Sequence, residues 1–247
     1  MQQYNYHLKE NITPAQIKEF LLSPINLLIF DFDGVLVDTQ VVANEIQFNY
    51  INKLQSLDLS LHEFGEKFSG MQVKTILEII QKEKDNIGSM PINKIVQDID
   101  NLVLQKLASQ SISPLPGVVD FLSSSSMKRC IGSNCSLRLL KPFLKSSNLE
   151  KYFNSYVFSA DMVTNPKPSP DLYLYAARYM GVNVEECLVI EDSIVGIQAA
   201  ISAGMQVVGI LAGSHTSSTD SNKLINNGAK AVFYDMRDLT NYLSTIK

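Results

Sequence analysis

Short, continuous hydrophobic segments recur along the chain, and most are followed by a loop and then by a stretch with helical periodicity. Continuous runs of this length indicate strands that are buried on both faces of a parallel sheet. The runs lie at residues 27–30, 129–132, 156–158, 187–190 and 206–210, with a further run at 231–234 that we expect at the edge of the sheet. The alternation predicts an α/β fold built on a doubly wound parallel sheet.

The segment between the first two hydrophobic runs is far longer than a single crossover helix requires. It lacks strong strand patterns and carries helical periodicity, most clearly at residues 76–80 and 95–103. We therefore predict an inserted helical domain over residues 40–112. The rest of the fold, residues 27–39 and 113–247, is predicted to form the core around the sheet.

Residues 1–26 precede the first predicted strand and form an N-terminal extension. Thr13 followed by Pro14 is typical of a helix start, with Thr13 as the N-cap and Pro14 at the first helical position. One short helix is expected in this extension.

Composition and charge narrow the classes of partner. The chain has 247 residues, with 21 Lys and Arg against 25 Asp and Glu, and a formal net charge of −4. Without a basic field, nonspecific binding to nucleic acid is not expected. The three cysteines are odd in number and form no CxxC pair, which favours a reducing compartment, and we expect a cytoplasmic protein. The apolar run at residues 20–30 is too short and interrupted to span a membrane, so no membrane partner is expected.

Acidic and hydroxyl side chains follow directly after several predicted strands. Asp31, Ser133 and the pair Glu191 and Asp192 occupy such positions, and the carboxyl ends of parallel strands meet at one edge of a sheet. Carboxylates brought so close repel one another, so a cation is expected among them. Oxygen-only ligands favour Mg²⁺. Asp31 and Asp192 are the best predicted ligands, with Glu191 and Asp33 completing the set.

These residue types also suit phosphoryl transfer. Asp31 can attack phosphorus and form an aspartyl phosphate, which divides hydrolysis into two easier displacements. Asp33 is predicted to act as acid and base, a role typically worth a factor of about 10² to 10⁴. Ser133 and Asn134 are predicted donors to phosphate oxygens. Lys167 is predicted to offset negative charge in the transition state.

Four segments together resemble, in order and separation, the four motifs of the haloacid dehalogenase superfamily. They are Asp-Phe-Asp-Gly-Val at 31–35, Ile-Gly-Ser-Asn at 131–134, Lys-Pro-Ser-Pro-Asp at 167–171 and Val-Ile-Glu-Asp-Ser at 189–193. The resemblance covers most of residues 27–213. It implies a Rossmann-like core, a Mg²⁺ cofactor and a helical cap inserted after the first motif, where the helical periodicity places the insert.

Within this family, the resemblance implies a choice between phosphatase and mutase. The second acid, Asp33, argues against cleavage of carbon–halogen or carbon–phosphorus bonds. The β-phosphoglucomutase group commonly has a His four residues after the Thr of its first motif and an Arg in the first cap loop. This chain has Ala43 and Val73 at those places. Both departures favour water as the final acceptor, so we expect a phosphatase acting on a small phosphorylated metabolite. A phosphosugar mutase is the alternative.

Neighbouring residues look similar to bacterial sugar-phosphate phosphatases of the 6-phosphogluconate phosphatase type, which implies a sugar phosphate as substrate. Two further classes are less compatible with the chain. Phospho-accepting receiver domains are shorter, contain no comparable helical insert, and do not space their acids as Asp31 and Asp33. A non-catalytic binding protein on the same scaffold would not need the complete set of polar motif residues. The sequence pattern specifies neither an oligomeric state nor the cap residues that contact substrate, for which Met71, Gln72 and Lys74 are candidates.

Overall fold

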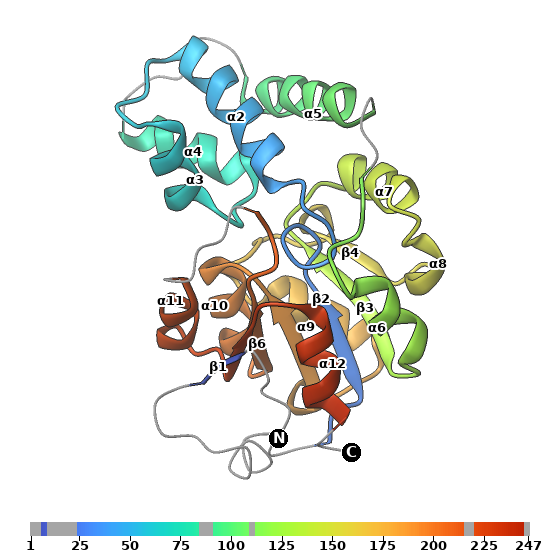
Figure 1. Ribbon diagram of the computed structural model, residues 1–247. Helices are drawn as coiled ribbons and strands as arrows, with labels where there is room; N and C mark the ends of the chain where they lie inside the picture. Colours follow the sequence, from blue (N-terminus) through green and yellow to red (C-terminus); the bar gives the residue numbers. More distant parts are fainter. Residues whose placement is uncertain (1–5, 9–23, 84–90, 109–111, 215–219, 245–247) are drawn as a thin grey trace.

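The computed structural model describes residues 6–8, 24–83, 91–108, 112–214 and 220–244. Within these residues the chain forms a seven-stranded sheet in the order β1-β7-β6-β5-β2-β3-β4 (Figure 1). The strands are β1 (Tyr6–Leu8), β2 (Leu27–Phe30), β3 (Lys128–Ser133), β4 (Val157–Ser159), β5 (Cys187–Glu191), β6 (Gln206–Ile210) and β7 (Ala231–Phe233). Strands β2 to β7 pair in parallel, which confirms the predicted parallel sheet.

The structure differs from the prediction at one edge of the sheet. Strand β7, expected at the edge, pairs with β6 on one side and with the antiparallel strand β1 on the other. Only a helix was predicted in the N-terminal extension, because a strand of three residues is too short to show a hydrophobic pattern. The predicted helix start at Thr13 and Pro14 lies outside the described residues.

Helices cover both faces of the sheet because successive strand residues point to opposite sides. Leu28 and Phe30 of β2 belong to one buried hydrophobic cluster, and Leu27 and Ile29 belong to the other. Helices packed in the first cluster are α6 (Val118–Ser124), α7 (Leu137–Ser146), α8 (Glu150–Phe153) and α12 (Met236–Ser244). Helices packed in the second are α9 (Asp171–Met180), α10 (Ile194–Ser202) and α11 (Asp220–Asn226).

Four further helices follow β2 and gather beyond the carboxyl ends of the strands, at the top of Figure 1. They are α2 (Gln40–Leu54), α3 (Leu61–Phe68), α4 (Val73–Glu83) and α5 (Ile92–Ala108). Helix α3 begins with a capping box, in which Ser60 and Glu63 satisfy each other's backbone N–H groups. The periodic segments at 76–80 and 95–103 fall in α4 and α5, as predicted. No helix in the described part of the chain is both long enough and apolar enough to cross a lipid bilayer.

The order of the strands places a crevice beside β2. From β2 the chain moves outward through β3 and β4, and then returns to the other side of β2 to form β5, β6 and β7. The connections that leave β2, β3 and β5 therefore diverge at the carboxyl ends of these three strands. In doubly wound sheets such a switch point is where ligands bind.

Candidate active site

A cavity of about 460 Å³ lies at this switch point, with helices α2, α4 and α5 contributing to its wall. Of the predicted site residues, those that line it are Asp31, Asp33, Ser133, Asn134, Lys167 and Glu191. Asp192 lies beside them: carboxylate oxygens of Asp31, Glu191 and Asp192 are within 4.8 Å of one another. The structure thus brings all the predicted site residues together.

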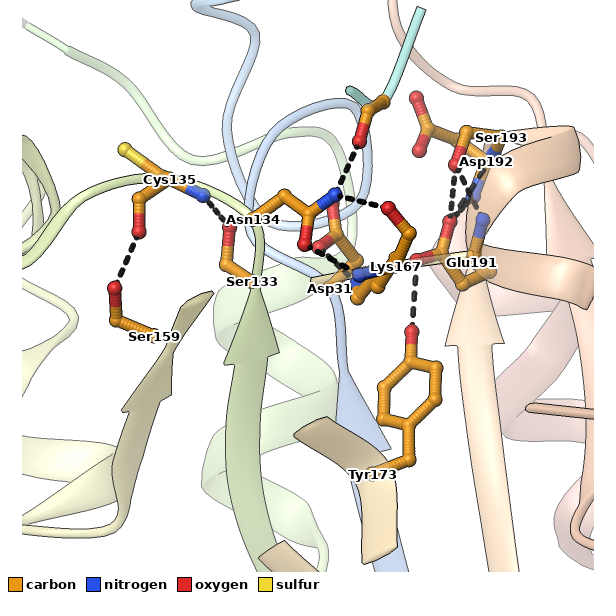
Figure 2. A network of polar contacts seen from close by, with 12 residues as sticks. Asp31, Ser133, Asn134, Cys135, Ser159, Lys167, Tyr173, Glu191, Asp192 and Ser193 are labelled. Carbon is orange, nitrogen blue, oxygen red and sulfur yellow. Dashed lines mark hydrogen bonds and ion pairs between the residues drawn. The ribbon is translucent and has the colours of Figure 1, made fainter. Parts of the chain in front are cut away.

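Lys167 is at the centre of the site. Its Nζ donates to Asp31 Oδ1 at 2.7 Å and to Glu191 Oε1 at 2.6 Å (Figure 2). The Tyr173 hydroxyl donates to the same Glu191 oxygen at 2.7 Å, and its ring centroid is 4.7 Å from the lysine Nζ. Only 2% of Lys167 is exposed, so it is not a solvated surface lysine.

Glu191 is anchored through its second oxygen as well. Oε2 accepts hydrogen bonds from the backbone N–H groups of Asp192 and Ser193 at 3.0 and 3.1 Å, and from the Ser193 hydroxyl at 2.9 Å. A Cβ added at Gly196 would lie 1.7 Å from Glu191 Oε1, so only glycine leaves room for the carboxylate. Glu191 therefore orients the loop that carries Asp192. Its predicted role as a metal ligand stays a prediction.

Burial and charge act differently on the three ionised groups. Burial lowers the pKa of Lys167, but the carboxylates of Asp31 and Glu191 outweigh it and raise the pKa. Burial raises the pKa of Glu191, but the charge of Lys167 together with the hydrogen bonds from Lys167, Tyr173 and the Ser193 N–H outweighs it, and the pKa is lowered. For Asp31, burial and the negative charges of Glu191 and Asp192 prevail over Lys167, and the pKa is raised well above its ordinary value. Asp31 is therefore the carboxylate whose charge is least compensated.

The donor set fits a hard divalent cation. The atoms that approach one another around Asp31, Glu191 and Asp192 are all carboxylate oxygens, the ligand type that Mg²⁺ prefers. A cation beside Asp31 would also favour its ionised form, which burial disfavours. The predicted Mg²⁺ site is thus compatible with the chemistry of the residues present.

A tight loop after β2 holds Asp33. Asp33 forms a β-bridge with Val37, and the Gly34 N–H donates to the Val37 carbonyl at 2.7 Å. Gly34 has a φ of 77°, which favours glycine. Asp33 is half-buried and lines the cavity two residues after Asp31, where the acid–base role was predicted.

Asn134 and Ser133 occupy the end of β3 and the loop after it. The Asn134 side chain donates to the Gly70 carbonyl at 2.8 Å and to the Lys167 carbonyl at 3.1 Å, and accepts from the Lys167 N–H at 3.0 Å. Both amide hydrogens of Asn134 are thus used within the protein, and a phosphate contact would require one bond to break. Ser133 Oγ accepts from the Cys135 N–H at 3.1 Å, which leaves its own hydrogen available for a phosphate oxygen.

Three residues of the site were not singled out from the sequence. Tyr173 was missed because a tyrosine within an apolar helix is usually part of the core. Asp100 on α5 is only 5% exposed and lines the cavity, and its position beside the buried residues Ile99 and Val103 was an available signal. Gln47 on α2 is 9% exposed and also lines the cavity, without a comparable signal in the pattern.

The fold and the site define a Rossmann-like protein with a lysine-bridged carboxylate centre and a helical insert over its active-site edge. The family model described as haloacid dehalogenase-like hydrolase matches residues 28–210. The chain therefore belongs to the haloacid dehalogenase-like hydrolases, which confirms the resemblance carried by the four motifs.

Several relatives match this chain over most of their own length. A 6-phosphogluconate phosphatase of Escherichia coli (strain K12) is 28% identical over 196 residues, which cover 78% of this chain and 86% of the relative. A phosphorylated carbohydrates phosphatase of Thermotoga maritima is 30% identical over 213 residues, covering 83% and 92% of the two chains. A crystal structure of a conserved haloacid dehalogenase-like protein of unknown function from Agrobacterium tumefaciens is 32% identical, with a TM-score of 0.74 over 90% of this chain and 99% of the other.

Proposed function

We propose that this protein is a Mg²⁺-dependent phosphatase that hydrolyses a small phosphorylated metabolite, a sugar phosphate, through an aspartyl-phosphate intermediate on Asp31. The observation that carries the proposal is the placement of Asp31 on the cavity wall, 2.7 Å from the buried Lys167 ammonium and two residues before Asp33. Relatives described as phosphatases of phosphorylated sugars and sugar acids support the same reaction.

In the first step, a carboxylate oxygen of Asp31 attacks phosphorus while the bond from phosphorus to the ester oxygen breaks. Asp33 donates a proton to that leaving oxygen, so the alcohol departs uncharged. Lys167 stabilises the negative charge of the transferring group and keeps its ion pair with Glu191 when Asp31 becomes esterified. When bound, Mg²⁺ would be held by Asp31 and Asp192 and would supply positive charge that reduces repulsion between the nucleophile and the phosphoryl oxygens.

In the second step, the carboxylate of Asp33 takes a proton from water, and the water oxygen attacks phosphorus. The bond between Asp31 and phosphorus breaks, which returns the carboxylate and releases inorganic phosphate. Asp33 thus ends the cycle protonated, ready for the next leaving group. Ser133 is positioned to donate its hydroxyl hydrogen to a phosphate oxygen in both steps.

We infer that residues 40–112 act as a cap over this chemistry. Two contacts support this role: the Asn134 side chain donates to the Gly70 carbonyl at 2.8 Å, and Gly70 lies so close to Ser193 that an added Cβ would be 2.6 Å from its hydroxyl. The loop before α4 is thereby packed against two motif loops of the core. Such a cap would exclude bulk water from the phosphoryl group.

The residues of the cavity wall favour a phosphatase over a mutase. Ala43 and Val73 both line the cavity at the positions where the mutase group carries a His and an Arg. Neither side chain can bind the second phosphate of a bisphosphate intermediate. Incubation with β-glucose 1-phosphate, followed by phosphorus NMR, should show inorganic phosphate, whereas glucose 6-phosphate would establish the mutase.

The two acids have separable roles, which tests the mechanism. Asp31→Asn should abolish Mg²⁺-dependent release of phosphate from p-nitrophenyl phosphate, because an amide is not a nucleophile toward phosphorus. Asp33→Asn should slow turnover by about 10² to 10⁴ because proton transfer is lost, and should allow phosphoenzyme to accumulate after rapid quenching. Asp120→Asn, on the exposed surface of α6, is the matched control and should leave turnover unchanged. Full activity in Asp31→Asn would rule out the nucleophile assignment.

A further inference from the structure

The cavity extends away from the catalytic carboxylates, between helices α2 and α5. Gln47 on α2 is one of its lining residues, and only 9% of this glutamine is exposed. Among the described residues its carboxamide has no hydrogen-bond partner, in contrast to Gln40 on the same helix, which donates to Asn44 at 2.9 Å. The carboxamide faces the open cavity, so it is available to hydrogen-bond a ligand that enters there.

Gln47 lines the cavity about two turns beyond the start of α2. It is seven residues after Gln40, the start of α2, and therefore roughly 10 Å along the helix axis. Ala43, one turn earlier on the same face, also lines the cavity, and its small side chain takes up little space there. A phosphate held at Asp31 would thus place its carbon chain along this face of α2.

The facing helix contributes a second buried polar group. Asp100 on α5 lines the cavity, is 5% exposed, and accepts a hydrogen bond from the Ser136 hydroxyl at 3.0 Å. The other buried side chains of this part of the wall are Val103, Leu139 and Phe143. Phe143 is the single aromatic residue among the described lining residues, so the wall has little surface for stacking a nucleobase.

We propose that Gln47 is a specificity-determining residue that hydrogen-bonds hydroxyl groups of a small polyhydroxylated phosphate monoester, with Asp100 accepting from hydroxyls on the opposite wall. This inference rests on the proposed phosphatase function and adds the residues that select its substrate. A carboxamide both donates and accepts, as a hydroxyl does, and each matches the other. An aryl or alkyl phosphate would offer the amide of Gln47 no hydroxyl partner.

The experiment compares hydroxyl-rich and hydroxyl-free substrates. Values of kcat and KM are measured with Mg²⁺ for sorbitol 6-phosphate, glucose 6-phosphate and ribose 5-phosphate, and for p-nitrophenyl phosphate. Gln47→Met keeps the length of the side chain and removes the amide. It should lower the ratio of kcat/KM for the best polyol phosphate to that for p-nitrophenyl phosphate by about tenfold, mainly through KM. Gln105→Met, on the exposed face of α5, should leave the ratio as it is.

Thermal unfolding of the substrate-free protein separates this role from a structural one. Because Gln47→Met removes an amide that makes no hydrogen bond to the described residues, its Tm should equal or exceed that of the parent. An unchanged selectivity ratio in Gln47→Met would overturn the inference, and so would a lower Tm or failure to fold. If the parent protein released phosphate from none of the four substrates, the proposed function itself would fail. If it hydrolysed them while the variant kept the parental ratio, only the assignment of Gln47 would fail.

Discussion

At the scale of single residues, the site depends on how one lysine is shared between two carboxylates. Lys167 is buried with Asp31 and Glu191, and an isolated buried charge would be strongly unfavourable. Glu191 has a lowered pKa, so in the proposed cycle Lys167 keeps a charged partner throughout. Asp31 could then lose its charge by becoming phosphorylated without leaving Lys167 unpaired.

The hydroxyl of Tyr173 gives a test of this arrangement, because it donates to Glu191 Oε1 at 2.7 Å. Tyr173→Phe keeps the ring beside Lys167 and removes only the donor. We expect the free energy of unfolding at neutral pH to fall by about 2 kcal/mol, the typical value of a hydrogen bond to a charged group. Urea unfolding at several pH values would measure it.

The pH dependence follows from the sign of the shift. The folded-state pKa of Glu191 lies below its ordinary value of 4.5, so its ionised form stabilises the protein above that pH, and this contribution is lost as pH falls through the folded pKa. Tyr173→Phe raises the folded pKa toward 4.5, so the difference between the variant and the parent should be constant at neutral pH and shrink below about pH 4.5. Tyr175→Phe, at a tyrosine that is 37% exposed, should show no such difference. A Tyr173→Phe deficit that persists unchanged in acid would contradict the charged state of Glu191.

At the scale of elements, the start of α10 fixes the short loop that follows β5 and carries Asp192. Ser193 is the N-cap of this helix, and its side chain accepts from the Gly196 N–H at 3.1 Å. The helix then presents small residues to the sheet, among them Ala199 and Ala200, which are fully buried. Gly196 is the residue against which the Glu191 carboxylate rests. The helix thus combines capping, close packing and placement of Glu191.

Gly196→Ala puts two effects in opposition. In a helix interior alanine is favoured over glycine by about 1 kcal/mol. Here the new Cβ would meet Glu191 Oε1 at 1.7 Å, and displacing that carboxylate would break its bonds to Lys167 and Tyr173. Breaking a buried ion pair costs about 3–5 kcal/mol, so we expect a net loss of at least roughly 2 kcal/mol in urea unfolding together with loss of turnover.

Gly65→Ala provides the matched control for this prediction. Gly65 lies within α3, and its added Cβ would be 3.4 Å from the Asn44 side chain, an ordinary contact. This variant should be neutral or more stable by up to about 1 kcal/mol. Equal stability changes in the two variants would show that Glu191 does not constrain residue 196.

At the scale of the whole molecule, the predicted cation site would couple folding to the binding of a cation. Asp31, Glu191 and Asp192 bring three carboxylates together, and Lys167 forms ion pairs with Asp31 and Glu191. Burial and the neighbouring carboxylates disfavour the negative charge of Asp31 most, and its pKa is raised. A cation that binds only the folded state stabilises that state by mass action.

Mg²⁺ should therefore raise the thermal midpoint of the metal-free protein. At a concentration of 100 times Kd the stabilisation amounts to about 2.7 kcal/mol. Differential scanning fluorimetry with MgCl₂, against NaCl of equal ionic strength, would measure the shift. Asp192→Asn should remove most of it, because a ligand and its charge are lost. A shift of full size in Asp192→Asn would place the cation elsewhere.

Much of the fold could be predicted because its determinants are local. Continuous apolar runs predicted strands β2 to β6 to within a residue or two, and periodicity predicted the helices α4 and α5. Strand β1 and the inner position of β7 could not be predicted in this way. Three residues carry too little pattern, and pairing between Tyr6–Leu8 and Ala231–Phe233 joins opposite ends of the chain.

The sequence by itself determined the chemistry of the site: two acids on one loop, a lysine in a later loop and two further acids after another strand, in the order of a known family. Residue type and spacing are local properties and can be read without coordinates. Only the tertiary structure decided the roles within that set. In the structure, Glu191 accepts hydrogen bonds from Lys167 and Tyr173, and the Asn134 side chain donates to the Gly70 carbonyl. Gln47 lines the cavity. These roles depend on contacts between distant segments, and a sequence pattern does not encode which side chain a buried group will meet.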